Sequence, residues 1–517
     1  MRQIARAAGT VTLAFLLTQL TGLLRGIIIY RAFGTSADLD SFNAANRVAE
    51  MLFNLMAGGA LGSAFIPTFT GLLTRDQKAL AWKLASAVAN LLLVGLTLIA
   101  GLAALFAPQI VRGGLFYLAP DLPPGQEALT VLLLRTLLPT VVIFGLSGLV
   151  MGILNAHQRF WLPAIAPALY SLGQIGGVLL LPAEWGVHRL ALGALTGALL
   201  HLLVQLPGLR RLRGSYSLTL GLYLAEVRQV AALMGPRILG VAVVQINFIV
   251  NTILALSLPE GSVSAVTLAF TLMLMPQAAI AQSAAIAAMP TFSAQAALGR
   301  LDELRAALAS TLRAVLLLAI PATAGLILLR IPLVSFLYEG GEFTSRSTAL
   351  VAWALLWYAA GLVGHSLVEV LARAFYALQD TRTPVGVGAA AMSLNILFSF
   401  VFMALFRGWG WQPHGGLALA NSLATALEMI GLLLLIRRKL GGLEGRQVWA
   451  GVGIALAGTL AMGLALWGWL RLAQDWPAWL VTGGGVLTGG LVYGGVLLAL
   501  KVPEGRALIN ALRRRLS

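Results

Sequence analysis

The chain has 517 residues, of which 59% are hydrophobic and only 10% are charged, and its formal net charge at pH 7 is +16. A soluble core cannot bury this much apolar surface, so the composition excludes a soluble globular protein and indicates helices covered by lipid. Cysteine is absent, which excludes a disulfide framework, thiol chemistry and thiolate metal sites.

Taken in chain order, about fourteen apolar segments reach the roughly 20 residues that a helix needs to cross a bilayer. Their approximate centres lie near residues 20, 52, 95, 140, 170, 197, 240, 275, 318, 360, 395, 425, 458 and 489. Open sheets cannot persist in lipid, and these segments are too long for barrel strands. We therefore expect an all-α integral membrane protein with about 14 transmembrane helices.

Charge alternates along the connections between these segments. The even-numbered connections and the ends of the chain are rich in arginine and lysine, as at Arg75, Lys78, Arg210, Arg211, Arg437, Arg438 and Arg513. The odd-numbered connections carry carboxylates instead, such as Asp38, Glu184, Glu260 and Asp475. The positive-inside rule then places both termini in the cytoplasm, and the net charge meets anionic lipid, with no nucleic-acid partner.

Two sequence blocks recur at nearly the same long offset. The first is Pro-Thr-Phe at Pro67–Phe69 and again at Pro290–Phe292. The second is Ala-x-Gln followed by proline, at Ala156, Gln158 and Pro163 and again at Ala377, Gln379 and Pro384. These repeats indicate a duplicated half, which is a common transporter architecture.

The repeat predicts three parts. Residues 1–215 form an N-terminal six-helix bundle, and residues 216–440 form a second six-helix bundle with an interfacial linker over 218–230. The two bundles are expected to be related by rotation about an axis near the membrane normal, as parallel repeats are. Residues 441–517 add two helices and a basic amphipathic tail over 504–516. These last two helices have no partner in the repeat, and we expect them to form an apolar groove suited to a lipid tail.

Charged side chains inside membrane spans are costly and therefore indicate function. Arg25 lies in the middle of the first span, and Arg47 lies three residues before Glu50 on one face of the second. Guanidinium groups suit phosphate, so Arg25 and Arg47 predict a cationic wall for an anionic head group. For Arg31 and Asp40, near the outer surface, an ion pair or a position at the interface is favoured.

Other polar residues in the spans allow several interpretations. Gln245, Asn247 and Asn251 in the seventh span are typical of interhelical hydrogen bonding, while Arg237 lies near its cytoplasmic end. A cation site shared by Asn251 and Asn395 is a weaker alternative. His365 and Glu369 lie four residues apart and fit either a proton relay or a structural pair. No metal spacing, nucleotide loop or nucleophile elbow is present, so we expect no cofactor and no enzyme.

Several motifs together resemble one family. They are Tyr30-Arg31-Ala32-Phe33-Gly34 with Asp40, Gly59 to Pro67, Gly152 to Ala156, Met234-Gly235-Pro236, Gly261 to Ser264, Glu342-Phe343-Thr344 and Phe375 to Pro384. Over essentially its full length the chain resembles the MurJ/MviN lipid II flippases of the multidrug/oligosaccharidyl-lipid/polysaccharide exporter superfamily. The resemblance implies fourteen spans with both ends inside, and arginines in a central cavity that hold a diphosphate.

The chain departs from that family pattern at the cavity. Arg25 is retained and Arg47 keeps its positive charge, but Gln19 and Phe53 stand where the family usually has arginines. The usual Asp-Arg pair of the eighth span corresponds to Phe270-Thr271. Arg237 is an additional cation that could compensate in part. The set of expected substrate-binding residues is therefore Arg25, Arg47, Asp40, Gln19, Phe53, Thr271 and Arg237.

The expected function is transport of lipid II, a polyprenyl-diphosphate-linked peptidoglycan precursor, from the inner to the outer leaflet by alternating access. The expected partners are this lipid-linked oligosaccharide, membrane lipids and other cell-wall assembly proteins, with the chain acting as a monomer in the bacterial cytoplasmic membrane. Because cavity arginines are missing, two alternatives stay open: a different lipid-linked sugar or amphiphile as cargo, and a non-transporting scaffold in envelope assembly. A membrane glycosyltransferase is disfavoured because the external connections are short.

Overall fold

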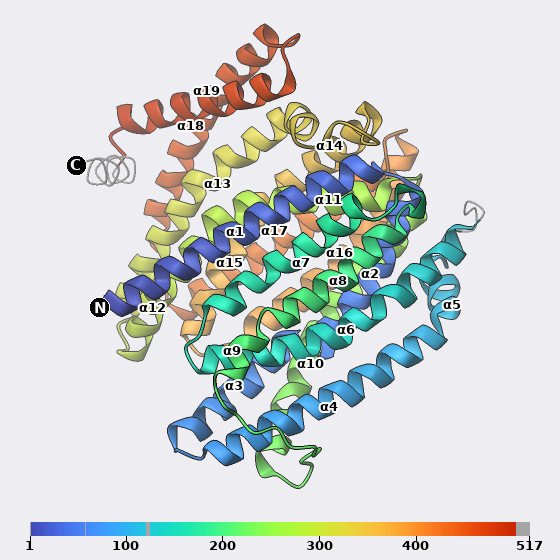
Figure 1. Ribbon diagram of the computed structural model, residues 1–517. Helices are drawn as coiled ribbons and strands as arrows, with labels where there is room; N and C mark the ends of the chain where they lie inside the picture. The colour runs from blue at the N-terminus through green and yellow to red at the C-terminus, as the bar shows by residue number, and fades with distance from the viewer. Residues whose placement is uncertain (1, 57, 120–124, 503–517) are drawn as a thin grey trace. The chain divides into compact units, whose positions relative to one another are not determined.

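The computed structural model describes residues 2–56, 58–119 and 125–502 (Figure 1). Throughout this part of the chain the regular elements are helices, apart from one isolated bridge between Gly340 and Phe343. The expected all-α fold is therefore confirmed. The predicted basic tail at 504–516 lies outside the described residues.

The elements follow one another with short connections. In chain order they are α1 (Arg2–Phe33), α2 (Ala37–Met56), α3 (Gly58–Thr74), α4 (Lys78–Leu105), α5 (Ala107–Ile110), η1 (Val111–Leu115), α6 (Gln126–Ala156), α7 (Trp161–Leu180), η2 (Ala183–Trp185), α8 (His188–Leu203), α9 (Leu206–Arg210), α10 (Ala225–Leu256), α11 (Ser262–Gln277), η3 (Ala278–Gln282), α12 (Ser283–Ala297), α13 (Leu301–Tyr338), α14 (Ser345–Ala360), α15 (Leu362–Ala377), α16 (Arg382–Gly408), α17 (His414–Lys439), α18 (Gly445–Leu472) and α19 (Ala478–Ala499).

The chain is a multi-pass membrane protein. Within the described residues, 10 helical segments are long and apolar enough to cross a bilayer, and up to 12 if two bent pairs each count as one span. The first pair bends by 46° within α10, and the second bends by 46° between α14 and α15. Neither α1 nor α2 is among these segments; α2 carries Asp38, Asp40, Arg47 and Glu50. The full count of fourteen therefore stays a prediction.

Backbone contacts divide the chain into two compact units. The first comprises Met1–Ser264 with Gly340–Phe343, and the second comprises Ala265–Glu339 with Thr344–Ser517. Helix α10 packs against α2 and α3, so contacts group it with the N-terminal helices. The expected boundaries at 215 and 440 come from the sequence repeat, which these contacts do not test. They therefore stay a prediction.

In the first unit, glycines set the closest helix approach. Helices α7 and α8 run side by side (Figure 1) and meet through Gly173, Gly177, Gly193 and Gly197. A Cβ atom at Gly173 would overlap the backbone of Gly197, and one at Gly177 would overlap the backbone of Gly193. Small residues allow such backbone contact between helices in lipid, so this pair is held at a fixed separation.

In the second unit, the last two helices pack onto a single long helix. Helix α18 runs along α13, and α19 folds back against both of them (Figure 1). The buried hydroxyl of Tyr493 on α19 donates a hydrogen bond of 2.5 Å to the carbonyl of Leu317 on α13. Leu329, Met462, Leu466 and Tyr493 form an apolar cluster at this junction.

The Ala-x-Gln blocks adopt the same local backbone in the two units. Helices α6 and α15 end at Ala156 and Ala377, and Gln158 and Gln379 follow in the left-handed conformation with φ of 57° and 58°. The next N–H then returns to the helix in both turns, at 2.9 Å for Arg159 and 3.0 Å for Asp380. This is the hydrogen-bond pattern of a left-handed helix end, and it supports the duplication.

The Pro-Thr-Phe blocks also correspond. Pro67 and Pro290 lie inside α3 and α12, and the phenylalanines that follow, Phe69 and Phe292, are fully buried. The ring of Phe69 stacks on Phe65 with centroids 5.1 Å apart. The rotation expected to relate the two halves stays a prediction.

The linker between the expected halves lies along α4. The side chain of Asn90 donates to the carbonyls of Ser217 and Thr219 at 3.1 and 2.8 Å, and it accepts from the hydroxyl of Tyr216 at 2.5 Å. Residues 214–224 have no helix, and α10 begins at Ala225. The expected interfacial segment 218–230 therefore consists of a non-helical connection up to residue 224 and the beginning of α10. Leu218 in this connection is 89% exposed, as an interfacial residue would be.

Candidate functional site

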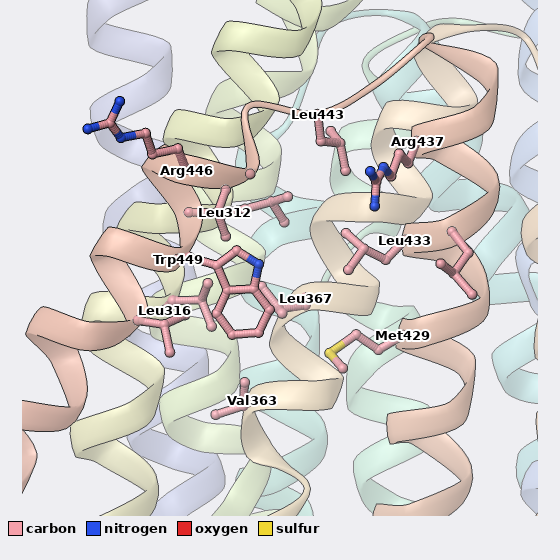
Figure 2. Close-up of a pocket in the computed structure, with 14 residues that line it drawn as sticks. Leu312, Leu316, Val363, Leu367, Met429, Leu433, Arg437, Leu443, Arg446 and Trp449 are labelled. Carbon is pink, nitrogen blue, oxygen red and sulfur yellow. The ribbon is translucent and has the colours of Figure 1, made fainter.

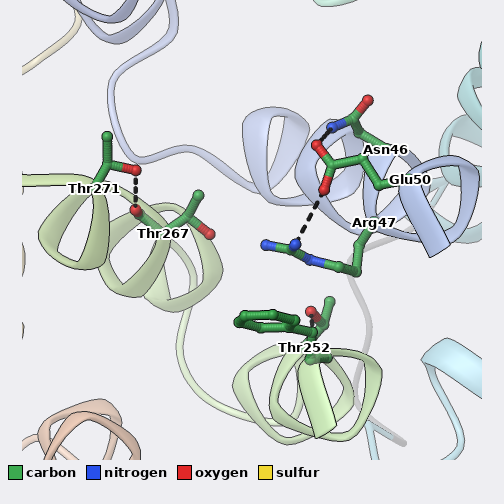
Figure 3. Close-up of polar contacts among 7 residues, drawn as sticks. Asn46, Arg47, Glu50, Thr252, Thr267 and Thr271 are labelled. Carbon is green, nitrogen blue, oxygen red and sulfur yellow. Dashed lines mark hydrogen bonds and ion pairs between the residues drawn. The ribbon is translucent and has the colours of Figure 1, made fainter. Parts of the chain in front are cut away.

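Arg47 on α2 is partly neutralised by its own helix. Its guanidinium lies 3.0 Å from the carboxylate of Glu50, whose other oxygen accepts a hydrogen bond of 2.8 Å from Asn46 (Figure 3). The guanidinium also lies over the ring of Phe248 on α10, 5.0 Å from its centroid. The Arg47 side chain is 26% exposed, so a ligand can contact it. The ion pair with Glu50 reduces the charge that it offers to that ligand.

Arg25 on α1 carries a less compensated charge. It is half-buried where α1 packs against α7, and within the part of the chain that the structure describes it forms no hydrogen bond or ion pair. Its charge and that of Glu50 both act on the hydroxyl of Tyr170, which accepts a hydrogen bond of 3.1 Å from Gln174. This geometry leaves the Arg25 guanidinium available to an anion.

Phe53 begins a row of aromatic rings. Its ring packs against Phe144 with centroids 5.7 Å apart, and Phe144 contacts Tyr170 and His201 at 5.1 and 5.3 Å. His201 is held in turn by the hydroxyl of Ser147, which lies 2.7 Å from its Nδ1. Phe53 therefore places an apolar ring against Phe144 at one end of this row. Nothing in the sequence indicated this row, because its members lie on four different helices.

Asp40 is bound by backbone groups. Its carboxylate accepts hydrogen bonds from the N–H groups of Gly261 and Ser264, at 2.8 and 2.7 Å, and the side chain is buried. The neighbouring N–H of Ala37 donates to Glu260 at 2.9 Å. The N–H of Ser264 lies in the first turn of α11, where an anion is stabilised. In this conformation both oxygens are occupied, and Asp40 is not available to a substrate.

The remaining expected site residues are dispersed. Gln19 on α1 and Thr271 on α11 are exposed, and the Thr271 hydroxyl donates to the carbonyl of Thr267 at 2.9 Å (Figure 3). The side chain of Arg237 lies outside the described residues. Thr271 thus presents an exposed, uncharged side chain.

The weak cation-site candidates belong to different units. The Asn251 amide donates to the carbonyl of Asn247 at 2.9 Å, and Asn395 accepts from the hydroxyl of Ser399 at 3.2 Å. Over the described residues, no group of three or more His, Cys, Asp or Glu side chains could hold a metal ion. These amides make local hydrogen bonds of the kind expected in membrane helices.

His365 and Glu369 do not pair with each other. The His365 ring lies 3.0 Å from the Asn421 amide oxygen, and Glu369 forms a salt bridge of 2.6 Å with Arg373. The interpretation of a His-Glu pair is therefore wrong, because each side chain has a better partner elsewhere.

An apolar groove follows the last two helices. It has a volume of about 490 Å³ and is lined by α11, α13, α18 and α19, with Leu272, Pro321, Leu329, Met462, Gly490 and Tyr493 among its walls. We refer to it as the tail groove. Its position agrees with the expectation that the last two helices form an apolar surface.

A family model described as "Lipid II flippase MurJ" matches residues 29–482. The chain belongs to the MurJ lipid II flippase family. The lipid II flippase MurJ of Burkholderia cenocepacia is 31% identical over 479 residues, which are 91% of each chain. The probable lipid II flippase MurJ of Vibrio cholerae is 28% identical over 519 residues, covering 97% of this chain and 96% of that protein.

Solved structures share the fold. A lipid II flippase MurJ in an inward closed conformation matches with a TM-score of 0.80 and 23% identity, covering 96% of this chain and 99% of that one. An inward-facing MATE family transporter of the MOP superfamily matches with a TM-score of 0.70 and 16% identity, covering 84% of this chain and 98% of that one. The MurJ fold is thus present over nearly the whole chain.

Proposed function

We propose that this protein transports lipid II from the inner to the outer leaflet of the bacterial cytoplasmic membrane by alternating access. The observation that carries the proposal is the guanidinium of Arg25, which has no hydrogen bond or ion pair among the described residues, in a chain of the MurJ family. A guanidinium binds phosphate oxygens through two parallel hydrogen bonds. Arg25 is then the main anchor of the diphosphate, and Arg47 assists it from within its pair with Glu50.

The remaining parts of the site have supporting roles in this proposal. The polyprenyl tail lies in the tail groove, whose walls are apolar. Gln19 on α1 and Phe53 on α2 contact the cargo beside Arg25 and Arg47 in the first unit. The protein works as a monomer with both ends in the cytoplasm, without a cofactor and without catalysing a covalent step; other cell-wall assembly proteins are its further partners.

A second candidate function is transport of a less anionic lipid-linked sugar or amphiphile. The observation that favours it is the low positive charge of the expected binding residues: Glu50 partly neutralises Arg47, and Phe53 and Thr271 are uncharged. A diphosphate would then be held by fewer charge-assisted hydrogen bonds. The non-transporting scaffold is the remaining alternative.

The test is complementation of a strain depleted of its lipid II flippase, combined with lipid II binding by the purified protein. Under the main proposal the wild type rescues growth, Arg25→Ala abolishes rescue and weakens lipid II binding, and Arg346→Ala, an exposed cation at the start of α14, changes neither. Phe53→Arg with Thr271→Arg should strengthen lipid II binding.

Each alternative has its own outcome. Failure of the wild type to rescue, with tighter binding of a neutral lipid-linked analogue than of lipid II, supports the second cargo. Failure to rescue with no binding of either lipid supports the scaffold.

A further inference from the structure

A second groove lies in the second unit, away from the tail groove. It has a volume of about 540 Å³ and is enclosed by α13, α15, α17 and the start of α18 (Figure 2). Its walls are apolar and include Leu312, Leu316, Val363, Leu367, Met429 and Leu433. None of these residues lines the tail groove. We refer to it as the α17–α18 groove.

Two arginines stand at one end of this groove. Arg437 belongs to the last turn of α17, and Arg446 to the first turn of α18. In Figure 2 both lie at the same end as Leu443; the Arg437 guanidinium points toward the groove, and that of Arg446 points away from it. As far as the chain is described, neither guanidinium forms an ion pair, whereas the nearby Lys439 is bound to Asp380 at 2.6 Å.

Trp449 lines the groove between the arginines and the apolar walls. It lies one turn into α18, its indole reaches between the walls (Figure 2), and it is 74% exposed. Tryptophan is enriched at the level of lipid head groups, where its ring is half apolar and half polar. The groove therefore presents charged side chains at one end, then an indole, then aliphatic side chains. This is the order of polarity along a phospholipid.

We propose that the α17–α18 groove is a binding site for one anionic phospholipid of the inner leaflet, with its phosphate on Arg437 and part of an acyl chain along α13 and α15. The volume lies within the range of about 300–1,000 Å³ typical of small-molecule sites. The apolar walls exclude a free anion as the main ligand, and the guanidinium of Arg437, which has no ion pair within residues 2–56, 58–119 and 125–502, favours a charged head group. The excess of cations at this end places it in the cytoplasmic leaflet.

The site has a structural consequence. A lipid bound there contacts α17 through Arg437 and α18 through Trp449, on either side of the connection 440–444. It therefore ties α18, which also carries part of the tail groove, to the helices of the second unit. This lipid is separate from the transported cargo, so the proposal does not depend on the identity of the substrate.

The experiment uses full-length protein in detergent and phospholipids brominated on the acyl chain, which quench nearby tryptophans. The signal is the difference in quenching between the wild type and Trp449→Phe, which isolates the contribution of Trp449. Brominated phosphatidylglycerol should quench at concentrations about tenfold lower than brominated phosphatidylcholine with the same chains, in line with a charge-assisted contact. Glycerol phosphate, which has the head group without chains, should not compete.

Three variants locate the head group. Arg437→Gln should reduce the preference for phosphatidylglycerol to that of phosphatidylcholine, and Arg446→Gln should reduce it less. Arg438→Gln, in the same turn but not lining the groove, is the matched control and should change nothing. Val363→Phe, which fills the apolar end, should weaken both lipids equally.

Several results would overturn the proposal. They are equal quenching by both lipids, an unchanged preference in Arg437→Gln, or competition by glycerol phosphate alone. Tighter competition by a polyprenyl phosphate than by phosphatidylglycerol would assign the groove to the cargo and also refute a separate phospholipid site.

Discussion

The carboxylate of Glu50 lies 3.0 Å from the guanidinium of Arg47, one helical turn away on α2. This ion pair partly offsets the positive charge of Arg47, because both side chains lie on the same face of one helix. Arg25 has no such partner among the described residues. Of these two arginines, Arg25 on α1 therefore carries the less compensated positive charge.

The first prediction concerns this pair. Glu50→Gln should strengthen lipid II binding by about 1 kcal/mol, or roughly fivefold. A partly exposed ion pair contributes about this much, and without it the full charge of Arg47 is available to the diphosphate. Binding of a neutral lipid-linked analogue should not change. Asp475→Asn, a charge change in the connection before α19, serves as the control. Weaker lipid II binding in Glu50→Gln would mean that Glu50 itself contacts the substrate.

The second prediction concerns the tail groove. Gly490 lines it, and a Cβ atom added at this residue would meet open space, so Gly490→Leu should fill the groove without straining the fold. We expect lipid II binding to fall several-fold while the thermal unfolding temperature stays the same. Gly494→Leu, on the same helix with equally open surroundings but outside the groove, should bind as the wild type does. Equal effects of the two variants would exclude the groove as the tail site.

The third prediction concerns α7 and α8. Gly173→Ala would force a methyl group into the backbone of Gly197 and should destabilise the protein by about 1–3 kcal/mol, as overpacking does. Gly176→Ala lies in the same helix, and its methyl group would meet only Leu180 at 3.8 Å. This control should be neutral in the same thermal or denaturant unfolding assay. A stable Gly173→Ala variant would show that the two helices can move apart.

The fourth prediction concerns pH. The Lys439 ammonium, the Thr383 N–H and the Thr383 hydroxyl lower the pKa of Asp380 from 3.8 to about 2. Because the folded pKa lies below the unfolded value, this contribution to stability is complete above pH 4 and is lost as the pH falls toward 2. Solvent screens the pair, so its magnitude is about 1 kcal/mol or less.

Two variants separate the parts of this effect. Asp380→Asn keeps an acceptor for the Thr383 N–H but loses the ion pair, and Asp380→Ala loses both. Unfolding measured between pH 7 and pH 3 should show a smaller loss of stability on acidification in both variants, with Asp380→Ala the less stable of the two at pH 7. A pH dependence equal to that of the wild type would contradict the assignment.

The fifth prediction concerns the left-handed turns. Gln158→Gly and Gln379→Gly should each stabilise the protein by up to about 1 kcal/mol, since glycine adopts positive φ without the Cβ clash. Leu378→Gly, one residue earlier with φ of −80°, should destabilise it. Chemical unfolding of the three variants provides the comparison. Destabilisation by both glutamine changes would indicate that their side chains have contacts of their own.

The fold could be predicted from the sequence because hydropathy and charge bias act over whole segments. The site could be predicted only in part. Spacing indicated that Arg47 and Glu50 share a face, and the structure pairs them. The same argument failed for His365 and Glu369, because Asn421 and Arg373 offered better partners. The tail groove was expected from the two unpaired last helices, but the ring row from Phe53 to His201 and the α17–α18 groove were not, because periodicity within one helix contains no information about how side chains of different helices meet.

The matching turns at Gln158 and Gln379 also constrain how such a chain can diverge. Each turn is held by backbone hydrogen bonds, which do not depend on the identity of the surrounding side chains. After a gene duplication, the two copies could therefore change what they present to a cargo while each kept the bend that directs its next helix. Symmetry would then persist longest in the path of the backbone, and specificity would be the property that is free to evolve.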